Sequence, residues 1–488
     1  MTAPRPADGG LADRVVVGFD LDMTLIDPRA GMVAVMAALS AETGVFIDGE
    51  AFASRLGPPL ADELRLWFPE DQVDAAGDRF RALSPAHAVA PTPAIDGAAE
   101  ALAASRAHGA HIVVITGKYG PNARLHLEHL DLDHDTLVGW AWADGKVDAM
   151  REHGAWVYVG DHPADMESAR QAGAAAIGVP TGAYTADELR AAGADVVLDS
   201  LHDFGSWLNA YVLDRRLAAL DASLRAHGSL LVAFSGGADS AFLLAAAVRA
   251  LGPDAVVAAT AVSPSLASGE LEAAAAFAAG LGVRHLTPAT HEMDRDGYRA
   301  NAGDRCAFCK SELLDVLGPL AAGQGLAAVA TGTNADDVRA GFRPGIAAAG
   351  ERGAVVPLRD AGLTKDQVRT ASRAWGLATW DKPAAACLSS RIAYGVQVTP
   401  EALARVDRAE AALRAALAEA GTPSREVRVR DLGGGAARIE VDAAVASALP
   451  GEAAAAVAAA GFDRVEVDPR GFRSGSMNEL LPDPERYR

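Results

Sequence analysis

Short apolar runs followed by small or acidic residues occur at two widely separated places in the chain. The first run covers residues 15–19 and the second covers residues 230–234, and each leads into a turn and then a helical pattern. Between them, further apolar runs at 112–115, 157–160 and 174–179 alternate with helical patterns. This alternation is typical of a parallel sheet with helices on both faces. The sequence therefore predicts an α/β protein with two separate α/β domains.

The spacing of these patterns also predicts where the domains begin and end. Residues 28–90 carry helical patterns and no apolar strand run, which indicates a helical cap over the first sheet. Beyond the second α/β domain, an amphipathic helix at 401–420 precedes two strand-like runs that flank Gly433, Gly434 and Gly435. The predicted division is 1–205 for the first domain, 206–216 for a linker, 217–400 for the second domain, 401–475 for a small α/β domain and 476–488 for a tail.

Composition narrows the classes of partner. The 488 residues are 50% hydrophobic and carry a formal net charge of -20, so a nucleic-acid backbone would meet a repulsive field. No segment has the apolar run of a signal peptide or a membrane span, so we expect a cytoplasmic protein. Three cysteines in so long a chain cannot form a disulfide scaffold and indicate a metal, a cluster or catalysis.

Acidic, hydroxyl and lysine side chains follow three of the apolar runs in the first domain. Because the carboxyl ends of parallel strands meet at one edge of a sheet, we expect these side chains to lie close together. A single D-x-D-x-T match fits helix-capping aspartates equally well, but three motifs in this order favour a common site. The motifs are FDLDMT with Asp20, Asp22 and Thr24, ITGK with Thr116 and Lys118, and VGDHPAD with Asp161 and Asp165.

Together these motifs resemble the haloacid dehalogenase superfamily, specifically its helical-capped phosphatases of the phosphoglycolate type, in which a lysine follows the threonine closely. The resemblance implies that Asp20 attacks phosphorus, while Asp22 protonates the leaving oxygen and later activates water. It implies that Thr116 and Lys118 hold phosphoryl oxygens. The Mg²⁺ ligands that it implies are Asp20 and Asp161, supported by Asp165.

The second domain begins with a glycine-rich turn. The run LLVAFSGGADSAFLL is a strand, a small-residue turn and a helix, in which glycines let the backbone approach an anion closely. No G-K-[ST] follows, so it is not a Walker A motif. It resembles the PP-loop of ATP pyrophosphatases, which implies that phosphates of ATP are held by Ser235, Gly236, Gly237, Asp239 and Ser240.

Four further motifs resemble those of one family, the ATP-dependent sacrificial sulfur transferases of nickel-pincer nucleotide synthesis. They are GDRCAFCK, TGTNADD with Asp336 and Asp337, PLRDAGLTKDQVR, and DKPAAACLSSRIAYG. The resemblance covers residues from about 217 to 470 and implies that a pyridinium mononucleotide carboxylate is adenylated and then attacked by sulfur. It also implies a homo-oligomer.

The cysteines leave the source of sulfur open. In single-cysteine members of that family the residue matching Cys387 gives up its own sulfur, whereas here Cys306 and Cys309 accompany it, as in members with a 4Fe-4S cluster on three cysteines. We favour the cluster. The alternative is a zinc site completed by His285 or His291.

Three arginines are candidates to clamp a substrate carboxylate or phosphate: Arg391 in CLSSR, and Arg428 and Arg430 in VRVR. For the last two, a solvated strand face is an equally good interpretation. A tRNA or small-molecule thiolase, an amidoligase and a catalytically idle first domain are the competing functional hypotheses. The acidic charge disfavours tRNA, the cysteines would be unexplained in an amidoligase, and the intact aspartates argue against an idle domain.

Overall fold

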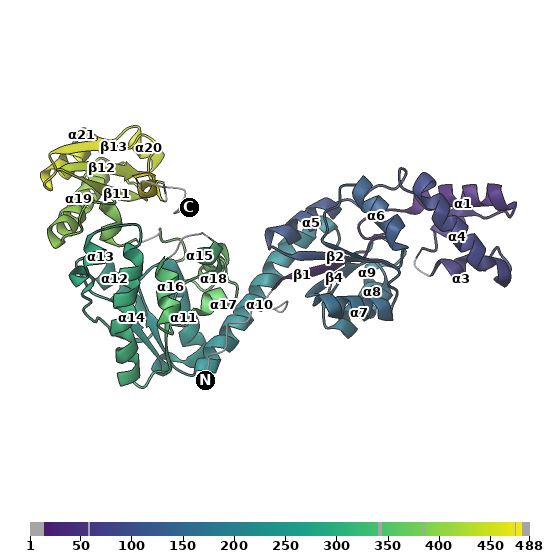
Figure 1. Ribbon diagram of the computed structural model, residues 1–488, viewed down its shortest axis with the longest axis horizontal. Coiled ribbons are helices and arrows are strands. Elements are labelled where there is room, and N and C mark those ends of the chain that lie inside the picture. The colour runs from purple at the N-terminus through teal and green to yellow at the C-terminus, as the bar shows by residue number, and fades with distance from the viewer. Residues whose placement is uncertain (1–13, 57–58, 340–343, 384–385, 474, 481–488) are drawn as a thin grey trace. The chain divides into compact units, whose positions relative to one another are not determined.

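The computed structural model describes residues 14–56, 59–339, 344–383, 386–473 and 475–480. The chain divides into two compact units, Met1–Val212 and Leu213–Arg488 (Figure 1). The boundary lies inside one helix, α10 (Phe204–His227), so the segment 206–216, which we expected to be a linker, is helical. None of the helices in the described ranges is long and apolar enough to cross a membrane.

The first unit is built on a six-stranded sheet in the order β3-β2-β1-β4-β5-β6, in which all neighbouring strands are parallel. The predicted α/β class and parallel sheet are confirmed for this unit. Two strands, β3 and β6, were not predicted because three and two residues are too few to show an apolar run. The strands are β1 (Val16–Phe19), β2 (His111–Ile115), β3 (Thr136–Val138), β4 (Val157–Gly160), β5 (Ala175–Gly178) and β6 (Val196–Val197).

Alternate side chains of this sheet enter two apolar cores, one on each face. Val17 and Phe19 of β1 belong to the core shared with α5, α6 and α10, whereas Val16 belongs to the core shared with α7, α8 and α9. Because both faces are covered, the strands are apolar throughout, which is why they stand out in the sequence. The helices are α5 (Ala98–Ala107), α6 (Gly120–His129), α7 (Asp144–His153), α8 (Pro163–Ala172) and α9 (Ala186–Ala191).

Four helices lie between β1 and α5 and form a cap with a core of its own. Val35, Met36 and Leu39 of the first helix pack against Phe80 and Leu83 of the fourth. The cap helices are α1 (Arg29–Thr43), α2 (Gly49–Ala53), α3 (Leu60–Leu64) and α4 (Glu70–His87). All four helices lie within residues 28–90, where the sequence showed helical patterns and no strand run.

The second unit contains a four-stranded parallel sheet in the order β10-β7-β8-β9. Its strands are β7 (Leu230–Ala233), β8 (Val256–Ala259), β9 (Arg284–Leu286) and β10 (Ala328–Thr331). The helices of this part are α11 (Ala238–Leu251), α12 (Glu270–Gly280), α13 (Asp296–Arg299), α14 (Arg305–Gly323), α15 (Ala335–Arg339), α16 (Pro344–Glu351), α17 (Pro357–Asp360) and α18 (Lys365–Ala374).

A three-stranded sheet follows in the same unit. Strands β11 (Val427–Gly433) and β12 (Ala436–Val441) are antiparallel, and β13 (Arg464–Val467) runs parallel to β12. Helices α19 (Pro400–Glu419), α20 (Ala443–Ala446) and α21 (Gly451–Ala459) complete this part. Part of the predicted tail is ordered against it, because the buried Ser476 hydroxyl donates to Glu440 Oε1 at 2.9 Å. Residues 481–488 of the tail lie outside the described ranges.

Candidate functional sites

Three carboxylates meet at the carboxyl edge of the six-stranded sheet. Asp20 follows β1, Asp161 follows β4, and Asp165 lies in the first turn of α8. Strands β1 and β4 are neighbours where the strand order reverses, which is the place where open α/β sheets bind ligands. All three side chains are buried, and one ligand atom of each lies within 4.8 Å of those of the other two. Three close carboxylates of this kind could hold a hard divalent cation such as Mg²⁺.

Burial controls the protonation of these groups. Burial raises the pKa of Asp20 to about 7, with the charges of Asp165 and Asp22 acting in the same direction and Lys146 opposing them. Burial, followed by the charges of Asp20 and Asp165, also raises the pKa of Asp161 well above its usual value. A cation bound among these carboxylates would favour their ionised forms.

These pKa shifts predict a pH-dependent response to Mg²⁺. Between pH 3.8 and about 7, Asp20 of the metal-free protein is protonated in the folded chain and ionised in the unfolded chain. Because the folded state binds the extra proton, the free energy of unfolding falls as the pH rises through this window. Mg²⁺ must displace this proton at about pH 5.5 but not at about pH 8. Addition of Mg²⁺ should therefore raise Tm more at pH 8 than at pH 5.5, by a difference of about 3 °C or more. Calorimetry of the full chain measures both rises.

The Asp161→Asn variant should lose this response, whereas replacement of the exposed Asp148 by asparagine should keep it. An equal rise in Tm at both pH values would contradict the assignment of the cation to this cluster.

The second aspartate of the first motif is paired with a lysine. Lys118 Nζ donates to Asp22 Oδ1 at 2.5 Å, and the Lys118 amide donates to the Thr116 hydroxyl at 3.1 Å. The Thr24 hydroxyl donates to Asp161 Oδ1 at 3.1 Å, which ties the first motif to the third. The structure thus brings all three motifs together, and it places Lys118 beside the proposed general acid.

A second lysine, which sequence reasoning missed, lies inside the carboxylate cluster. Lys146 of α7 is buried, and its Nζ donates to Asp20 Oδ1 at 2.8 Å and to Asp165 Oδ1 at 2.6 Å. Burial lowers the pKa of Lys146, but the two carboxylates outweigh it and the pKa is raised well above its usual value. The only signal in the sequence was a lysine in the first turn of a helix, which is normally an exposed position.

In the second unit, the glycine-rich turn joins β7 to the start of α11. Gly236 has φ 71°, a conformation that favours glycine, and the Ser240 hydroxyl donates to the Gly237 carbonyl at 3.1 Å. The loop after β10 comes so close that a Cβ on Gly332 would lie 2.9 Å from the Ser240 nitrogen. Backbone N–H groups at the start of a 14-residue helix form an anion site.

This turn opens into a cavity of about 760 Å³. Asp239 lines it, and the buried Asp239 Oδ1 has no hydrogen-bond partner in the described part of the chain, while burial raises the pKa of this carboxyl. An unpaired buried carboxylate oxygen beside an anion site suits a bridging cation and a triphosphate, so the residues present fit Mg²⁺ and ATP. Asp337 of the TGTNADD motif also lines the cavity, whereas Asp336 accepts the amide of Lys365 at 2.8 Å.

Two of the three cysteines line the same cavity. Cys306 and Cys309 lie one turn apart at the start of α14, and Cys387 immediately precedes the short 3-10 helix Leu388–Arg391. Cys309 and Cys387 line the cavity. Burial raises the pKa of the Cys309 thiol to about 12, and the nearby charges of Cys387, Glu292 and Cys306 add to the rise. Cys309 therefore lies near both other cysteines.

The zinc alternative finds no support among the described residues. There the only group of three or more metal-binding side chains within 4.8 Å is the carboxylate cluster of the first unit, so neither histidine joins the thiols. His285 Nε2 instead lies 2.8 Å from the Thr260 hydroxyl.

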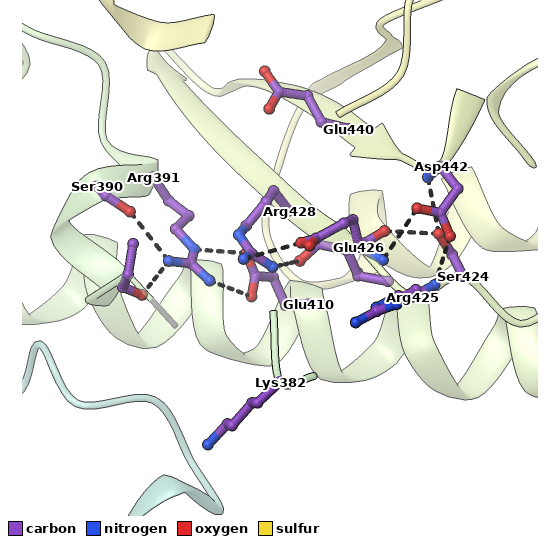
Figure 2. A network of polar contacts seen from close by, with 12 residues as sticks. Lys382, Ser390, Arg391, Glu410, Ser424, Arg425, Glu426, Arg428, Glu440 and Asp442 are labelled. Atoms are coloured by element: carbon purple, nitrogen blue, oxygen red, sulfur yellow. Dashed lines mark hydrogen bonds and ion pairs between the residues drawn. The ribbon is translucent and has the colours of Figure 1, made fainter. Parts of the chain in front are cut away.

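Arg391 is paired with a carboxylate of the protein itself, Glu410. Arg391 is buried, and its guanidinium makes two hydrogen bonds to Glu410 at 2.9 and 3.2 Å (Figure 2). Arg391 Nη1 also donates to the Cys387 carbonyl at 3.1 Å. It lines the cavity, but its donors hold the protein rather than a ligand. Arg391 therefore holds the backbone of Cys387 in place, and its role as a substrate clamp stays a prediction.

The two strand arginines differ from each other. Arg430 is buried, forms an ion pair with Glu440 at 2.7 Å and is not among the described residues that line the cavity, so its role as a clamp stays a prediction without support from this structure. Arg428 lines the cavity and forms an ion pair with Glu426 at 3.2 Å (Figure 2). Sequence reasoning missed Lys382, whose Nζ donates to the Gly236 carbonyl at 3.1 Å. Its place five residues before Cys387 was the available signal.

The buried pair of Arg391 and Glu410 predicts a stability effect. Arg391→Met leaves the Glu410 carboxylate buried without its main partner, so we expect a loss of about 3–5 kcal/mol, whereas replacing both residues by methionine should cost much less. Arg414 also contacts Glu410 but is half exposed, so Arg414→Met should cost less than about 1 kcal/mol. Urea unfolding of the full chain measures these differences, and equal effects of the Arg391 and Arg414 variants would contradict the positioning role.

Comparisons with known proteins found one family model and several relatives. The haloacid dehalogenase-like hydrolase family model matches residues 17–179. The probable phosphatase IndB of Dickeya dadantii is 31% identical over 208 residues, 38% of this chain and 90% of that protein.

Two further relatives match about half of the chain each. A pyridinium-3,5-bisthiocarboxylic acid mononucleotide synthase of Lactiplantibacillus plantarum is 34% identical over 272 residues, 55% of this chain and 96% of that protein. An uncharacterised protein of Synechocystis sp. is 44% identical over 256 residues, 51% of this chain and 92% of that protein.

Proposed function

We propose two activities for this chain from the two families to which it belongs. Its first part belongs to the haloacid dehalogenase-like hydrolases. The rest belongs to the family of the pyridinium-3,5-bisthiocarboxylic acid mononucleotide synthase of Lactiplantibacillus plantarum. The second unit is an ATP-dependent sulfur transferase that converts a carboxylate of a pyridinium mononucleotide to a thiocarboxylate in nickel-pincer nucleotide synthesis. The first unit is a Mg²⁺-dependent phosphohydrolase.

One observation carries the sulfur-transferase proposal. A single cavity of about 760 Å³ is lined by the PP-loop residues Ser235, Gly237 and Asp239 and also by Cys309 and Cys387. Adenylation and sulfur transfer need a nucleotide site and a thiol within reach of one carbonyl carbon. An amidoligase would account for the loop but not for two thiols beside it, and the net charge of -20 disfavours tRNA as a substrate.

The proposed reaction has two steps. A substrate carboxylate oxygen attacks the α-phosphorus of ATP, pyrophosphate leaves, and an acyl-adenylate forms. Sulfur then attacks the acyl carbon, the carbon–oxygen bond to AMP breaks, and the backbone N–H groups at the start of α11 stabilise the departing charge. A 4Fe-4S cluster held by Cys306, Cys309 and Cys387 would present external sulfide for repeated transfer, whereas without one Cys387 would lose its own sulfur.

The phosphohydrolase proposal rests on the cluster of buried carboxylates. Asp20 attacks phosphorus and forms an aspartyl-phosphate, and Asp22 gives its proton to the leaving oxygen and then takes one from water. Lys118 holds the Asp22 carboxylate at 2.5 Å and so orients it. Mg²⁺ among Asp20, Asp161 and Asp165 would offset the repulsion between phosphate and carboxylate.

Labelled sulfide tests the sulfur transferase. The full chain is incubated without oxygen with ATP, a pyridinium mononucleotide carboxylate and ³⁴S-sulfide, and products and protein are weighed by mass spectrometry. We expect a thiocarboxylate that carries the label. A protein lighter by one H₂S with unlabelled product would assign the sulfur to Cys387, and formation of no thiocarboxylate would refute the proposal.

Reconstitution tests the cluster. Anaerobic addition of iron and sulfide to the full chain should give the visible and paramagnetic resonance spectra of a 4Fe-4S cluster, and Cys306→Ala should lose them. Bound zinc or free thiols in the wild-type chain would refute the cluster. The homo-oligomeric state stays a prediction, which sedimentation of the same sample tests.

A further inference from the structure

The three cysteines come from two separate parts of the second unit. Cys306 and Cys309 share the first turn of α14, which sets their spacing, whereas Cys387 comes from a distant segment that leads into the 3-10 helix Leu388–Arg391. Sulfur transfer that involves Cys387 and the other two cysteines therefore depends on how these two segments are held relative to each other. The short helix α13 (Asp296–Arg299) and the residues just after it contact both segments.

Helix α13 packs against the first turn of α14. Gly297 comes so close to Phe308, the residue before the second cysteine of the C-x-x-C motif, that a Cβ at position 297 would overlap the Phe308 ring. The buried Arg305 lies in the same turn, and its Nη1 donates to Asn301 Oδ1. Close packing and a buried hydrogen bond therefore hold the start of α14 to this part of the chain.

The same residues also bind the segment that follows Cys387. Tyr298 of α13 is fully buried, and its hydroxyl lies 2.6 Å from the hydroxyl of Ser389, two residues after Cys387. Asn301 Nδ2 donates to the Ala393 carbonyl at 2.8 Å. Asn301 has φ 54°, which is uncommon and persists where the surroundings hold it. The Cys387 segment is therefore tied to α14 through Tyr298 and Asn301.

The Tyr298 hydroxyl lies near one thiol of each segment. Burial, followed by the charge of Cys387, raises the pKa of Tyr298, and the charge of Cys309 adds to the rise, so the phenol stays neutral and can donate a hydrogen bond. Neither Tyr298 nor Ser389 is among the described residues that line the cavity of the PP-loop. The hydrogen bond between them can therefore act on the reaction only through the cysteines beside it.

We propose that Tyr298 is a positioning residue for sulfur transfer: α13, packed against the start of α14, carries its ring, and its hydroxyl holds Ser389, and with it Cys387, at the spacing that the three cysteines need. This inference rests on the proposed sulfur-transferase activity. Loss of the hydrogen bond displaces the sulfur relative to the acyl carbon and leaves the PP-loop unchanged, and a misplacement of about 1 Å can cost about 10²-fold in rate.

The test removes this hydrogen bond from either side in the full chain, by Tyr298→Phe, by Ser389→Ala and by both together. We expect each single variant to lower the rate of the first turnover of thiocarboxylate formation about 10-fold or more. The double variant should be no slower than the slower single variant, because all three lack the same bond. Exchange of labelled pyrophosphate into ATP, with the carboxylate substrate present, should stay within about 2-fold of wild type.

The matched control is Ser372→Ala. Ser372 of α18 is also a fully buried serine of the second unit, its hydroxyl has no hydrogen-bond partner within the described ranges, and it does not line the cavity. This variant should transfer sulfur at the wild-type rate. In chains reconstituted with iron and sulfide, Tyr298→Phe should also shift the paramagnetic resonance signal of the reduced cluster, because the missing hydroxyl lay near two of its ligands, and Ser372→Ala should not.

The outcomes separate this inference from the proposed function beneath it. Sulfur transfer at the wild-type rate by Tyr298→Phe and Ser389→Ala would overturn the positioning role and leave the sulfur transferase standing. An equal loss of pyrophosphate exchange and of thiocarboxylate formation would assign Tyr298 to general stability and would also overturn it. If Tyr298→Phe does not fold, Ser389→Ala tests the same bond. Formation of no thiocarboxylate by the wild-type chain would overturn the proposed function and this inference together.

Discussion

The Cys387→Ser chain should form no thiocarboxylate, a loss of at least about 10³-fold, and should still exchange labelled pyrophosphate into ATP when the carboxylate substrate is present. Cys387 lines the cavity beside the PP-loop, and a serine oxygen can neither donate sulfur nor replace a soft thiolate ligand. The groups that bind ATP are separate from this side chain, so adenylation survives. The two assays together measure the step that Cys387 serves.

Cys306→Ser is the informative companion, because Cys306 is exposed and is not one of the described residues lining the cavity. If the three cysteines hold a cluster, this variant loses multiple-turnover transfer as well. If Cys387 gives up its own sulfur, the Cys306 variant keeps one turnover per chain. Full thiocarboxylate formation by Cys387→Ser would refute a role of Cys387 in sulfur transfer, whereas a carboxamide formed from added ammonia would favour an amidoligase.

The Asp20→Asn chain should lose p-nitrophenyl phosphate hydrolysis by at least about 10³-fold, because the amide neither attacks phosphorus nor balances the cation. Asp22→Asn should cost about 10²–10⁴-fold through loss of general acid catalysis. The effect of Asp22 should be smaller for p-nitrophenyl phosphate than for an alkyl ester, since nitrophenolate leaves without a proton.

The matched control is Asp148→Asn on α7, an exposed aspartate on the same helix as Lys146. Its activity should equal that of the wild-type chain, and both Asp20 and Asp148 variants should retain thiocarboxylate formation by the second unit. If Asp20→Asn kept more than a tenth of the wild-type hydrolysis rate, Asp20 would not be the nucleophile, and the role that the family resemblance implies for it would be wrong.

Much of the catalytic edge could be predicted from sequence because it follows buried strands. A parallel strand covered on both faces is an unbroken apolar run, so its end is visible, and the side chains just beyond it must lie at the ligand-binding edge. Asp20, Thr116 and Asp161 were found in this way, and Ser235 and Gly236 follow β7 by the same logic.

Residues that approach a site from elsewhere leave no such signal. Lys146 reaches Asp20 from a helix 126 positions away, and Lys382 reaches the Gly236 carbonyl from a loop 146 positions away. A lysine is normally exposed, and only the folded chain shows that each of these side chains is turned inward to meet an oxygen. The contact between Tyr119 and Trp140 is another example, since these residues meet only through the pairing of adjacent loops.

The sequence by itself determined the α/β order of the first unit, the strand-end aspartates and the glycine turn, because these depend on neighbouring residues and on the period of apolar positions. Only the tertiary structure decided which partners the arginines have. Arg391 and Arg430 are committed to Glu410 and Glu440, whereas Arg428 lines the cavity, although Arg428 and Arg430 share one strand motif. The physical reason is that a buried guanidinium must be neutralised by whichever carboxylate packing brings to it, and a strand pattern shows the side of the sheet but not the partner.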